Sequence, residues 1–546
     1  MKRHLSLLLL FLCCCTSDEA GNNSPPTSIS CKADPFPSQL IETSGLYERV
    51  LDPKAEESRI RFKARDGHIL TAYIYRATGF SVTDGPIVFV LHGAARNAID
   101  YLRRFKPIAE RHGALAIAPE FPESIYGPGS DRFTLAVGNK KPPYTDTYRA
   151  REWRPRDDYL YSEIEHLFEA IRRELNSGEC TYRIWGHSAG GQFVHRMMTF
   201  RSDARIASAV AVNAGFYTLP AYGNGSDPNY FMPYGLQGTP LHADDIRNLL
   251  EAPLVVLVGE LDTETGQESR SVRDSNAANF QGPNRRKRAE FYYQMGKQEA
   301  NRLGLKFGWR FAVVPGAGHN ARKIGPSAAW FLFSSPGEIP CVPTTTENSG
   351  GLMINEIYGD PANGLAGDAN NDGLRDPQED EFVELVNTSD HDICLSGWYL
   401  GDASDPSRHR FPVGSLLPAG KALVVFGGGV QTGQFGGAEI QTAVSTGGLN
   451  LNNKGDVLSL LDAQGKIHQS VSWGDCNGKQ CAKEHILHAI AVDQSLTRWP
   501  EAEGPFALHG HTKDETTYSP GTKVDGAPFN FPLLHRQTSD KVDASM

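Results

Sequence analysis

Between residues 87 and 314 the chain alternates short apolar runs with longer stretches of helical pattern. Apolar residues recur near i, i+3 and i+4 in the longer stretches, most clearly in Tyr159–Leu175 and Lys287–Leu303. A hairpin pattern, Arg59–Ala64 followed by Ile69–Tyr75, precedes them. Strands that are apolar throughout and alternate with helices predict a mostly parallel sheet covered by helices on both faces. The strand-like runs are Ile87–Leu91, Leu115–Ala118, Tyr182–Trp185, Ala207–Val212, Leu254–Val258 and Phe311–Val314.

The character of the sequence changes near Pro343. Residues 344–351 are polar and end in two glycines, which predicts a linker after a first domain at 46–343. Beyond the linker, Gly, Pro and Asp turns separate short strand-like segments with little helical pattern, which predicts an all-β sandwich over 352–527 and a tail at 528–546. The segments are Leu352–Ile357, Glu381–Val386, Ala422–Phe426, Val457–Leu461 and Ser470–Trp473.

The N-terminus has the pattern of an export signal at residues 1–15. A basic start, Lys2–His4, is followed by the apolar run Leu5–Leu12 and a cysteine triplet that ends at Cys15. This pattern is typical of a lipoprotein signal cut before a lipid-carrying cysteine, and simple secretion is the alternative. The polar residues 16–45 then form a tether. We expect an exported protein, either anchored to a membrane surface by lipid or secreted.

Composition excludes some classes of function. The chain has 546 residues, of which 40% are hydrophobic and 22% are charged, as in ordinary globular proteins. Its formal net charge of −10 gives no basic surface for non-specific nucleic-acid binding, so no nucleic-acid partner is expected.

Six cysteines follow the signal segment, in a compartment where disulfides persist. Cys476 and Cys481 are close enough in sequence to pair. Cys31 and Cys341 flank the first domain and could staple it, although the sequence alone does not fix the connectivity. Cys180 and Cys394 lie beside strand-like segments and are interpreted as buried free thiols. The six are Cys31, Cys180, Cys341, Cys394, Cys476 and Cys481.

The motif Gly186-His187-Ser188-Ala189-Gly190 stands directly after an apolar run and directly before a helical segment. A serine hydroxyl at the tip of a sharp strand-to-helix turn needs small residues on both sides, because the backbone must fold tightly there. The pattern therefore predicts that Ser188 is a nucleophile. His187, inside the same turn, is interpreted as a packing residue.

An acid and a histidine follow Ser188 in the chain order that this arrangement requires. Asp262 comes just after the fifth apolar run, and His319 comes on a Gly-rich loop after the sixth. We expect His319 to take the Ser188 proton and Asp262 to orient the imidazole, with Glu260 or Glu264 as the alternative acid.

The first strand-like run leads into a turn of small residues, His92-Gly93-Ala94-Ala95. A backbone N–H of this turn can stabilise a developing oxyanion together with the N–H that follows the nucleophile. The expected donors are Ala94 and Ala189, and no cofactor is expected for catalysis.

With these motifs, residues 50–335 resemble the α/β-hydrolase superfamily. The elbow, together with Asn213–Tyr217 after the next strand, is also similar to extracellular polyester depolymerases and related esterases. The resemblance implies an α/β hydrolase fold and a serine hydrolase that cleaves carboxylic esters, polyesters included, through an acyl-enzyme.

The second domain has its own resemblance. Met353–Ile357, Asp380–Asn387 and Leu395–Trp398, with Ser519-Pro520-Gly521 near the end, resemble the lamin-tail domain. The resemblance implies an immunoglobulin-like β-sandwich and a role in attachment to a surface or matrix, with a passive spacer as the alternative.

One loop of the second domain, Asp368–Glu379, has the spacing of a calcium-binding loop. Oxygen-bearing residues fall at positions 1, 3, 5, 9 and 12, with Gly373 at position 6, as in an EF-hand loop. No paired helices are expected around it, so the ion would be structural. The expected ligands are Asp368, Asn370, Asp372, Leu374, Asp376 and Glu379.

The hypothesis from sequence is an exported serine hydrolase acting on carboxylic esters, with an attachment domain behind it. One alternative is a surface-adhesion or matrix-binding lipoprotein whose hydrolase domain is vestigial. The other is a peptidase of the same fold, since this fold supports several reactions.

Overall fold

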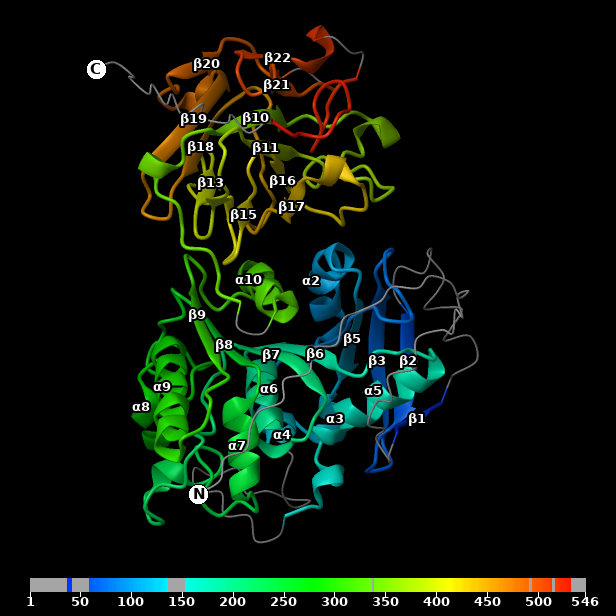
Figure 1. Cartoon of the computed structure of the whole chain (residues 1–546), viewed down its shortest axis with the longest axis vertical. Helices are drawn as coiled ribbons and strands as arrows, with labels where there is room; N and C mark the ends of the chain where they lie inside the picture. The colour runs from blue at the N-terminus through cyan, green and yellow to red at the C-terminus, as the bar shows by residue number, and fades with distance from the viewer. Residues whose placement is uncertain are drawn as a thin grey trace, which may run out of the picture.

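The computed structural model describes residues 37–41, 58–135, 153–335, 338–490, 493–512 and 516–531. They form two domains that follow one another in the chain (Figure 1). The predicted signal segment, Cys15, Cys31 and most of the tether and tail lie outside the described residues. Within the described part of the chain, no helix has the length and apolar character needed to cross a membrane.

The first domain is built on a nine-stranded sheet in the order β1-β2-β3-β5-β4-β6-β7-β8-β9. The strands from β5 to β9 run parallel, whereas β1, β2 and β3 are joined by antiparallel pairing, and β3 is antiparallel to β5. Each of the six apolar runs forms a strand, as predicted. The strands are β1 (Gln39–Leu40), β2 (Ser58–Lys63), β3 (Ile69–Arg76), β4 (Ile87–Leu91), β5 (Leu115–Glu120), β6 (Tyr182–His187), β7 (Ile206–Val212), β8 (Leu254–Gly259) and β9 (Arg310–Val314).

Helices cover both faces of this sheet. Figure 1 shows α2 and α10 on the face toward the second domain, and α5, α6 and α7 on the opposite face. The α-helices are α2 (Ala98–Arg111), α3 (Glu123–Tyr126), α4 (Asp131–Thr134), α5 (Ser162–Glu174), α6 (Ala189–Phe200), α7 (Ala243–Glu251), α8 (Asn276–Gln281), α9 (Arg285–Leu303) and α10 (Ala321–Phe333). Short 3-10 helices are η1 (Arg156–Asp158) and η2 (Pro228–Tyr230).

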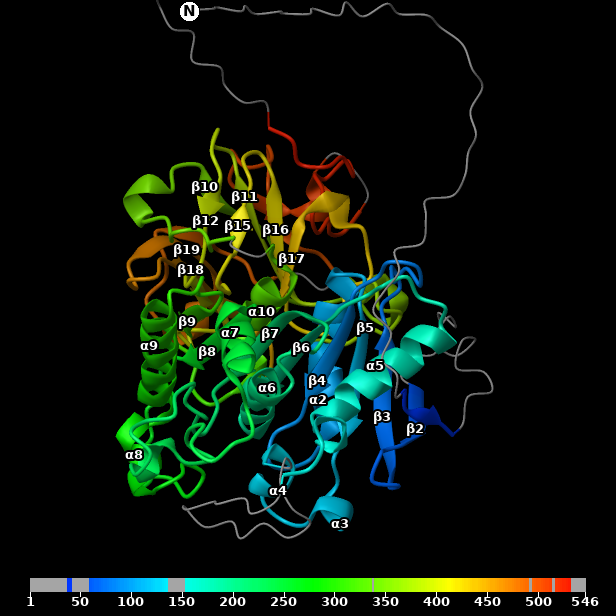
Figure 2. The same ribbon diagram turned by 60° about the horizontal axis from the view of Figure 1, so that its bottom comes forward.

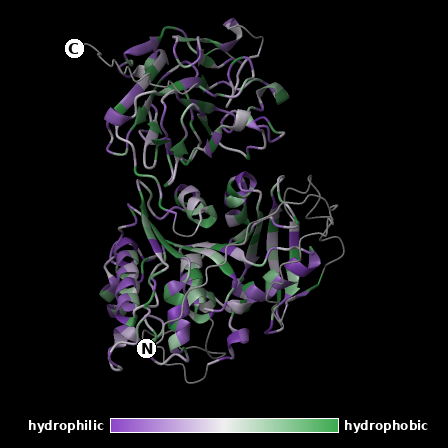
Figure 3. Ribbon diagram, viewed as in Figure 1, coloured by the Kyte–Doolittle hydropathy of each residue, from purple (hydrophilic) through white to green (hydrophobic). Residues whose placement is uncertain are grey.

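Successive residues of a strand point to opposite faces, so each central strand contributes to two cores. In β4, Val88 and Val90 join the core under α2 and α10, while Phe89 and Leu91 join the core under α5 and α6. This is why the strands are apolar throughout. Figure 3 shows the hydrophobic residues gathered along the sheet and on the inner sides of the helices.

The second domain packs two main sheets face to face, as the sequence predicted. Their orders are β17-β16-β11-β10-β21-β22 and β14-β13-β18-β19-β20, and β12 pairs with β15. The buried Trp398 and Trp473 belong to the core between them. The strands are β10 (Leu352–Tyr358), β11 (Phe382–Asn387), β12 (Ile393–Cys394), β13 (Tyr399–Gly401), β14 (His409–Arg410), β15 (Leu416–Leu417), β16 (Ala422–Phe426), β17 (Glu439–Thr442), β18 (Gly455–Leu461), β19 (Ile467–Gly474), β20 (Glu484–Ile486), β21 (Leu496–Arg498) and β22 (Phe506–Leu508), with 3-10 helices η3 (Thr346–Asn348), η4 (Gly364–Gly367), η5 (Phe435–Gly437), η6 (Cys476–Gly478) and η7 (His509–His511).

The two domains pack directly against each other at α10. The Ser327 hydroxyl accepts the Val413 N–H at 3.1 Å, and Val413 packs against the core under α10. A Cβ at Gly414 would lie 2.1 Å from the Trp330 ring, so only glycine fits there. Figure 2 shows α10 beside the strands of the second domain from a second direction.

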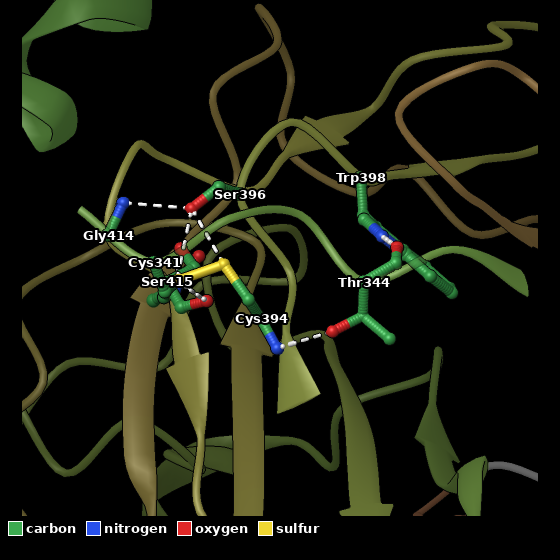
Figure 4. Close-up of a disulfide and its surroundings, with 8 residues drawn as sticks. Cys341, Thr344, Cys394, Ser396, Trp398, Gly414 and Ser415 are labelled. Carbon is green, nitrogen blue, oxygen red and sulfur yellow. Dashed lines mark hydrogen bonds between the residues drawn. A yellow bond between two sulfur atoms is a disulfide. The ribbon is translucent and has the colours of Figure 1, made fainter. Parts of the chain in front are cut away.

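Residues 344–351, predicted as a linker, are attached to the second domain instead of hanging free. The Trp398 indole donates to the Thr344 carbonyl at 2.7 Å, and the Thr344 hydroxyl accepts the Cys394 N–H at 3.0 Å (Figure 4). Thr346 Oγ1 donates to Asp462 at 2.6 Å. The hydroxyls of Thr344 and Thr346 form hydrogen bonds with residues of the sandwich, so this segment is fixed to the second domain.

The cysteine pairing corrects two of the three expectations. Cys476 and Cys481 are bonded, as expected. Cys341 is bonded to Cys394, so it does not pair with Cys31 and Cys394 is not a free thiol (Figure 4). Cys180 is also disulfide-bonded. The Cys341–Cys394 bond joins the segment after α10 to β12, which only the packed sandwich brings near.

Candidate active site

Ser188 stands at a sharp turn between β6 and α6. Its backbone has φ 59° and ψ −116°, a conformation that L-residues rarely adopt and that the surrounding structure must hold in place. A Cβ on Gly186 would lie 2.3 Å from the Gly190 carbonyl oxygen, and one on Gly190 would lie 2.5 Å from the Leu91 oxygen. The glycines of the motif are therefore required by close backbone approach, as predicted for a nucleophile elbow.

Ser188, His319 and Asp262 form one continuous line of hydrogen bonds. His319 Nε2 lies 3.0 Å from Ser188 Oγ, and His319 Nδ1 lies 2.8 Å from Asp262 Oδ2. His319 is 27% exposed, whereas Asp262 is 1% exposed. The acid therefore lies behind the imidazole, while the histidine and serine reach the surface of the site.

The carboxylate of Asp262 has a second partner that sequence reasoning missed. Arg285, at the start of α9, approaches Asp262 Oδ1 at 3.1 Å, and both side chains are buried. Each carboxylate oxygen thus has a fixed donor, which holds the orientation of Asp262. A buried arginine 23 residues away gave no local signal in the sequence.

The alternative acids do not take this position. Glu260 accepts the Gly316 N–H at 2.8 Å. Among the described residues, no hydrogen bond or ion pair joins Glu264 to His319. Asp262 is therefore the acid that contacts the histidine.

The turn expected to supply an oxyanion donor is built around a buried histidine. His92 Nε2 accepts the Phe121 N–H at 3.1 Å, and burial lowers the pKa of His92 to about 4, so the ring is neutral. Ala94 lines the same cavity as Ser188, and Ala189 is the first residue of α6. Within the described residues, the N–H groups of Ala94 and Ala189 have no hydrogen-bond acceptor.

His187, although inside the elbow, has a supporting role in the geometry. Its ring lies 4.6 Å from the His319 ring and 3.1 Å from the Tyr101 hydroxyl. Burial, and next the neighbouring His319, lower the pKa of His187 well below its ordinary value. A neutral buried ring packed behind His319 fits the interpretation of His187 as a packing residue.

A cavity of about 480 Å³ opens over Ser188. This is within the range of small-molecule sites, which span roughly 300–1,000 Å³. All but one of its lining residues come from the first domain; the exception, Thr446, comes from the second. The lining residues are Gly93, Ala94, Ala95, Asn97, Tyr101, Arg104, His187, Ser188, His319, Asn320, Ala321, Arg322 and Thr446.

The predicted calcium loop is a curled segment whose side chains cap its own backbone. Asp368 accepts the N–H groups of Asp372 and Gly373, and Asn370 Oδ1 accepts the Asp372 N–H at 3.0 Å. Its carboxylates are not gathered into a cluster of metal-ligand spacing. Among the described residues, the one group of three or more His, Cys, Asp or Glu ligand atoms within 4.8 Å is Cys476, Cys481 and His485, two of which form a disulfide.

Comparison with known proteins supports two separate likenesses. The family model of the lamin tail domain matches residues 345–475. A poly(3-hydroxybutyrate) depolymerase from Bordetella parapertussis is 32% identical, over 52% of this chain and 91% of its own, with a TM-score of 0.45. A poly(aspartic acid) hydrolase from Sphingomonas sp. KT-1 is also 32% identical, over 51% and 98%, with a TM-score of 0.46. A search of curated proteins finds no match.

The sheet order and the strand–elbow–helix geometry give the first domain the α/β-hydrolase fold. The chain belongs to the α/β-hydrolase superfamily and carries a C-terminal lamin tail domain.

Proposed function

We propose that this protein is an exported serine hydrolase that cleaves carboxylic esters through an acyl-enzyme on Ser188. The observation that carries the proposal is the line Ser188 Oγ, His319 Nε2, His319 Nδ1 and Asp262 Oδ2, with bonds of 3.0 Å and 2.8 Å. A serine hydroxyl is a weak nucleophile unless an adjacent base takes its proton, and this line supplies that base.

In the first half of the reaction, Ser188 Oγ attacks the ester carbonyl carbon while its proton passes to His319 Nε2. The carbonyl oxygen becomes an oxyanion, and the N–H groups of Ala94 and Ala189 stabilise it. The tetrahedral intermediate then breaks its bond to the alcohol oxygen, which leaves with the proton from His319. The product is an alcohol and an acyl-enzyme on Ser188.

In the second half, His319 removes a proton from water as the water oxygen attacks the acyl carbon. Collapse of the new intermediate breaks the bond to Ser188 Oγ, which recovers its proton from His319. The carboxylic acid leaves and the enzyme returns to its starting state. Asp262, held by Arg285, keeps the imidazole in the orientation that both halves use.

The test is hydrolysis of a substrate panel by the full-length protein: p-nitrophenyl esters of short and long acyl chains, a soluble polyester oligomer, and peptides. The proposal predicts turnover of esters that the Ser188→Ala variant loses. Turnover of peptides but not of esters would assign the peptidase alternative, and no turnover of any substrate would favour the vestigial domain.

The N-terminal segment and the C-terminal domain carry three further proposals. The signal-like start supports export with a lipid anchor at Cys15 or simple secretion, and the detergent partitioning and N-terminal mass of the mature protein distinguish them. We also propose that the loop Asp368–Glu379 binds Ca²⁺ as a structural ion, supported by its ligand spacing. The C-terminal domain is also proposed to attach the protein to a surface or insoluble polymer. Co-sedimentation of the Ser188→Ala protein with that material tests this attachment.

A further inference from the structure

The C-terminal domain contributes a wall to the cavity that holds Ser188. Thr446 lines that cavity together with His319 and the oxyanion turn. It lies 258 positions after Ser188 in the chain and belongs to the segment between β17 and β18. Attachment alone does not require a residue of this domain in the catalytic cavity, so the position of Thr446 suggests a contact with substrate.

The turn that presents Thr446 is closed by its own hydrogen bonds. The Gly448 N–H donates to the Ser445 carbonyl at 3.4 Å, and the Ser445 hydroxyl donates to the Gly448 carbonyl. Gly447 has a φ of 87°, which glycine adopts without strain. Val444 and Ser445 are buried and Thr446 is exposed, so the turn is anchored in the sandwich with Thr446 at its tip.

The position of this turn over the cavity is held by the contact between the domains. Val413 and Gly414 pack on α10, and a Cβ at Gly316 would lie 2.4 Å from the Arg410 side chain. The Cys341–Cys394 disulfide ties the end of the first domain to the sandwich. Thr446 is therefore placed by folding and not by a flexible tether.

The charged side chains that line the catalytic cavity are cationic. Arg104 of α2 and Arg322 of α10 both line it, and no carboxylate does. Neither guanidinium forms an ion pair with a carboxylate among the described residues, and both residues are exposed. Asp262 does not compensate them, because it lies buried behind His319 with Arg285 as its partner.

The same two arginines also line a second cavity of about 820 Å³ between the domains. Arg104, Ala321 and Arg322 line both cavities, so these three residues lie at the boundary between the space over Ser188 and the interdomain space. Further basic side chains of the first domain line that space: Arg76, Arg103, Lys106 and Arg111. Three carboxylates, Asp100, Asp372 and Glu379, line the second cavity, and the positive charge of Arg322 acts on Glu379 there.

We propose that the lamin tail domain completes the substrate-binding site, and that this site selects esters whose chain carries a carboxylate a few carbons from the scissile bond. Arg104 and Arg322 bind the carboxylate through charge-assisted hydrogen bonds, and Thr446 contacts the chain of the ester where it lines the same cavity. Half-esters of dicarboxylic acids and acid-terminated oligoesters share this chemistry. The inference rests on the proposed function, because it assigns the specificity of the same site.

The charge part is tested with two esters that differ only in charge: the p-nitrophenyl half-ester of adipic acid, and the same molecule with its free carboxyl methylated. An exposed ion pair changes an equilibrium by up to about fivefold, so two arginines predict roughly a tenfold preference in kcat/KM for the acid. The preference should shrink as salt rises, since exposed charges are screened over about 10 Å at 0.1 M salt.

Arg104→Gln and Arg322→Gln should each reduce this acid-to-methyl preference by about threefold to fivefold. Arg247→Gln, an exposed arginine on α7 that lines neither cavity, is the charge-matched control and should leave the preference unchanged. Equal turnover of the two esters by the unmodified protein overturns the inference while leaving the proposed function standing. Absence of turnover of both adipate esters and of p-nitrophenyl acetate overturns the proposed function itself.

The domain part is tested by Thr446→Trp, with Leu487→Trp as the control at an exposed position of the same domain that lines neither cavity. The bulky ring should lower kcat/KM for the adipate esters at least fivefold more than for p-nitrophenyl acetate, because only the longer chain reaches the turn. An equal effect of Thr446→Trp on both chain lengths, or no effect on either, contradicts a role for the turn in substrate binding.

Discussion

The two domains both bury carboxylates, but they satisfy them in opposite ways. In the hydrolase domain, Asp262 is paired with the buried cation Arg285 and contacts His319. In the lamin tail domain, Glu384 is buried among neutral donors, accepting from Asn355 at 2.8 Å and from the Gly521 N–H at 2.7 Å. The first acid is placed to orient a histidine, whereas the second accepts bonds from Asn355 and Gly521 and so holds strands and loops together.

This difference shows that burial of an acid does not by itself mark a functional site. Burial raises the pKa of Glu384 well above its ordinary value, and the neighbouring Glu356 raises it further. A perturbed carboxyl is a common sign of catalysis. In this protein Asp262, which lies in line with His319 and Ser188, is the functional candidate. Glu384, whose pKa is strongly raised, has a structural role.

The largest expected effect is the loss of ester turnover when a catalytic residue of the hydrolase domain is replaced. Ser188→Ala and His319→Ala should each lower kcat for esters by about 10⁶-fold, because the two residues act as a unit. The double variant should be no worse than either single one. Ester hydrolysis assays measure kcat for the three variants, and circular dichroism shows whether each is folded. A kcat for the double variant far below that of both single variants would mean that the two residues act separately.

A smaller effect is expected for the acid. Asp262→Asn should lower kcat by about 10⁴-fold, because the amide favours the wrong imidazole tautomer. Glu260→Gln, the matched control two residues away, should cost much less, since Glu260 bonds the Gly316 N–H and not His319. If Glu260→Gln proves the more damaging change, the assignment of the acid is wrong.

For the calcium loop of the lamin tail domain the expected effect is on stability and not on turnover. Calcium at about 100 times its dissociation constant should stabilise the fold by about 2.7 kcal/mol, and Asp372→Ala should remove the effect. Thermal melting of the full-length protein in calcium and in chelator measures it. Equal melting temperatures for the unmodified protein would end the calcium proposal.

The buried glutamate predicts a pH dependence of definite sign. Because the pKa of Glu384 is raised in the folded state, its contribution to stability is full below the ordinary pKa of 4.5 and is lost as pH rises toward the folded value. Glu384→Gln should therefore flatten the loss of stability between pH 5 and pH 8, measured by urea unfolding. Glu503→Gln, an exposed control in the same domain, should leave the slope unchanged.

Much of this could be predicted from sequence, for identifiable reasons. Buried parallel strands must be apolar on both faces, so Ile87–Leu91 and its companions are visible as runs. The elbow, Asp262 and His319 follow strand ends, which sequence order locates. The orientation of Asp262 by Arg285 was not visible, because it depends on where α9 begins relative to β8.

Features that depend on packing between distant elements escaped prediction. The Cys341–Cys394 bond joins residues that only the folded sandwich brings together. Thr446 has no motif around it, and its place over Ser188 depends on how the sandwich sits on α10. Local patterns identify elements and motifs, whereas contacts between domains need the three-dimensional structure.

The most direct test of the central claim is labelling of the full-length protein with a fluorophosphonate, followed by mass spectrometry of its peptides. An activated serine in line with a histidine should give one adduct, on Ser188, that blocks ester turnover in proportion to labelling. Labelling should be absent in Ser188→Ala and slowed by orders of magnitude in His319→Ala. Unlabelled Ser188 in a folded protein that still turns over esters, or an adduct on another serine that abolishes turnover, would contradict the assignment.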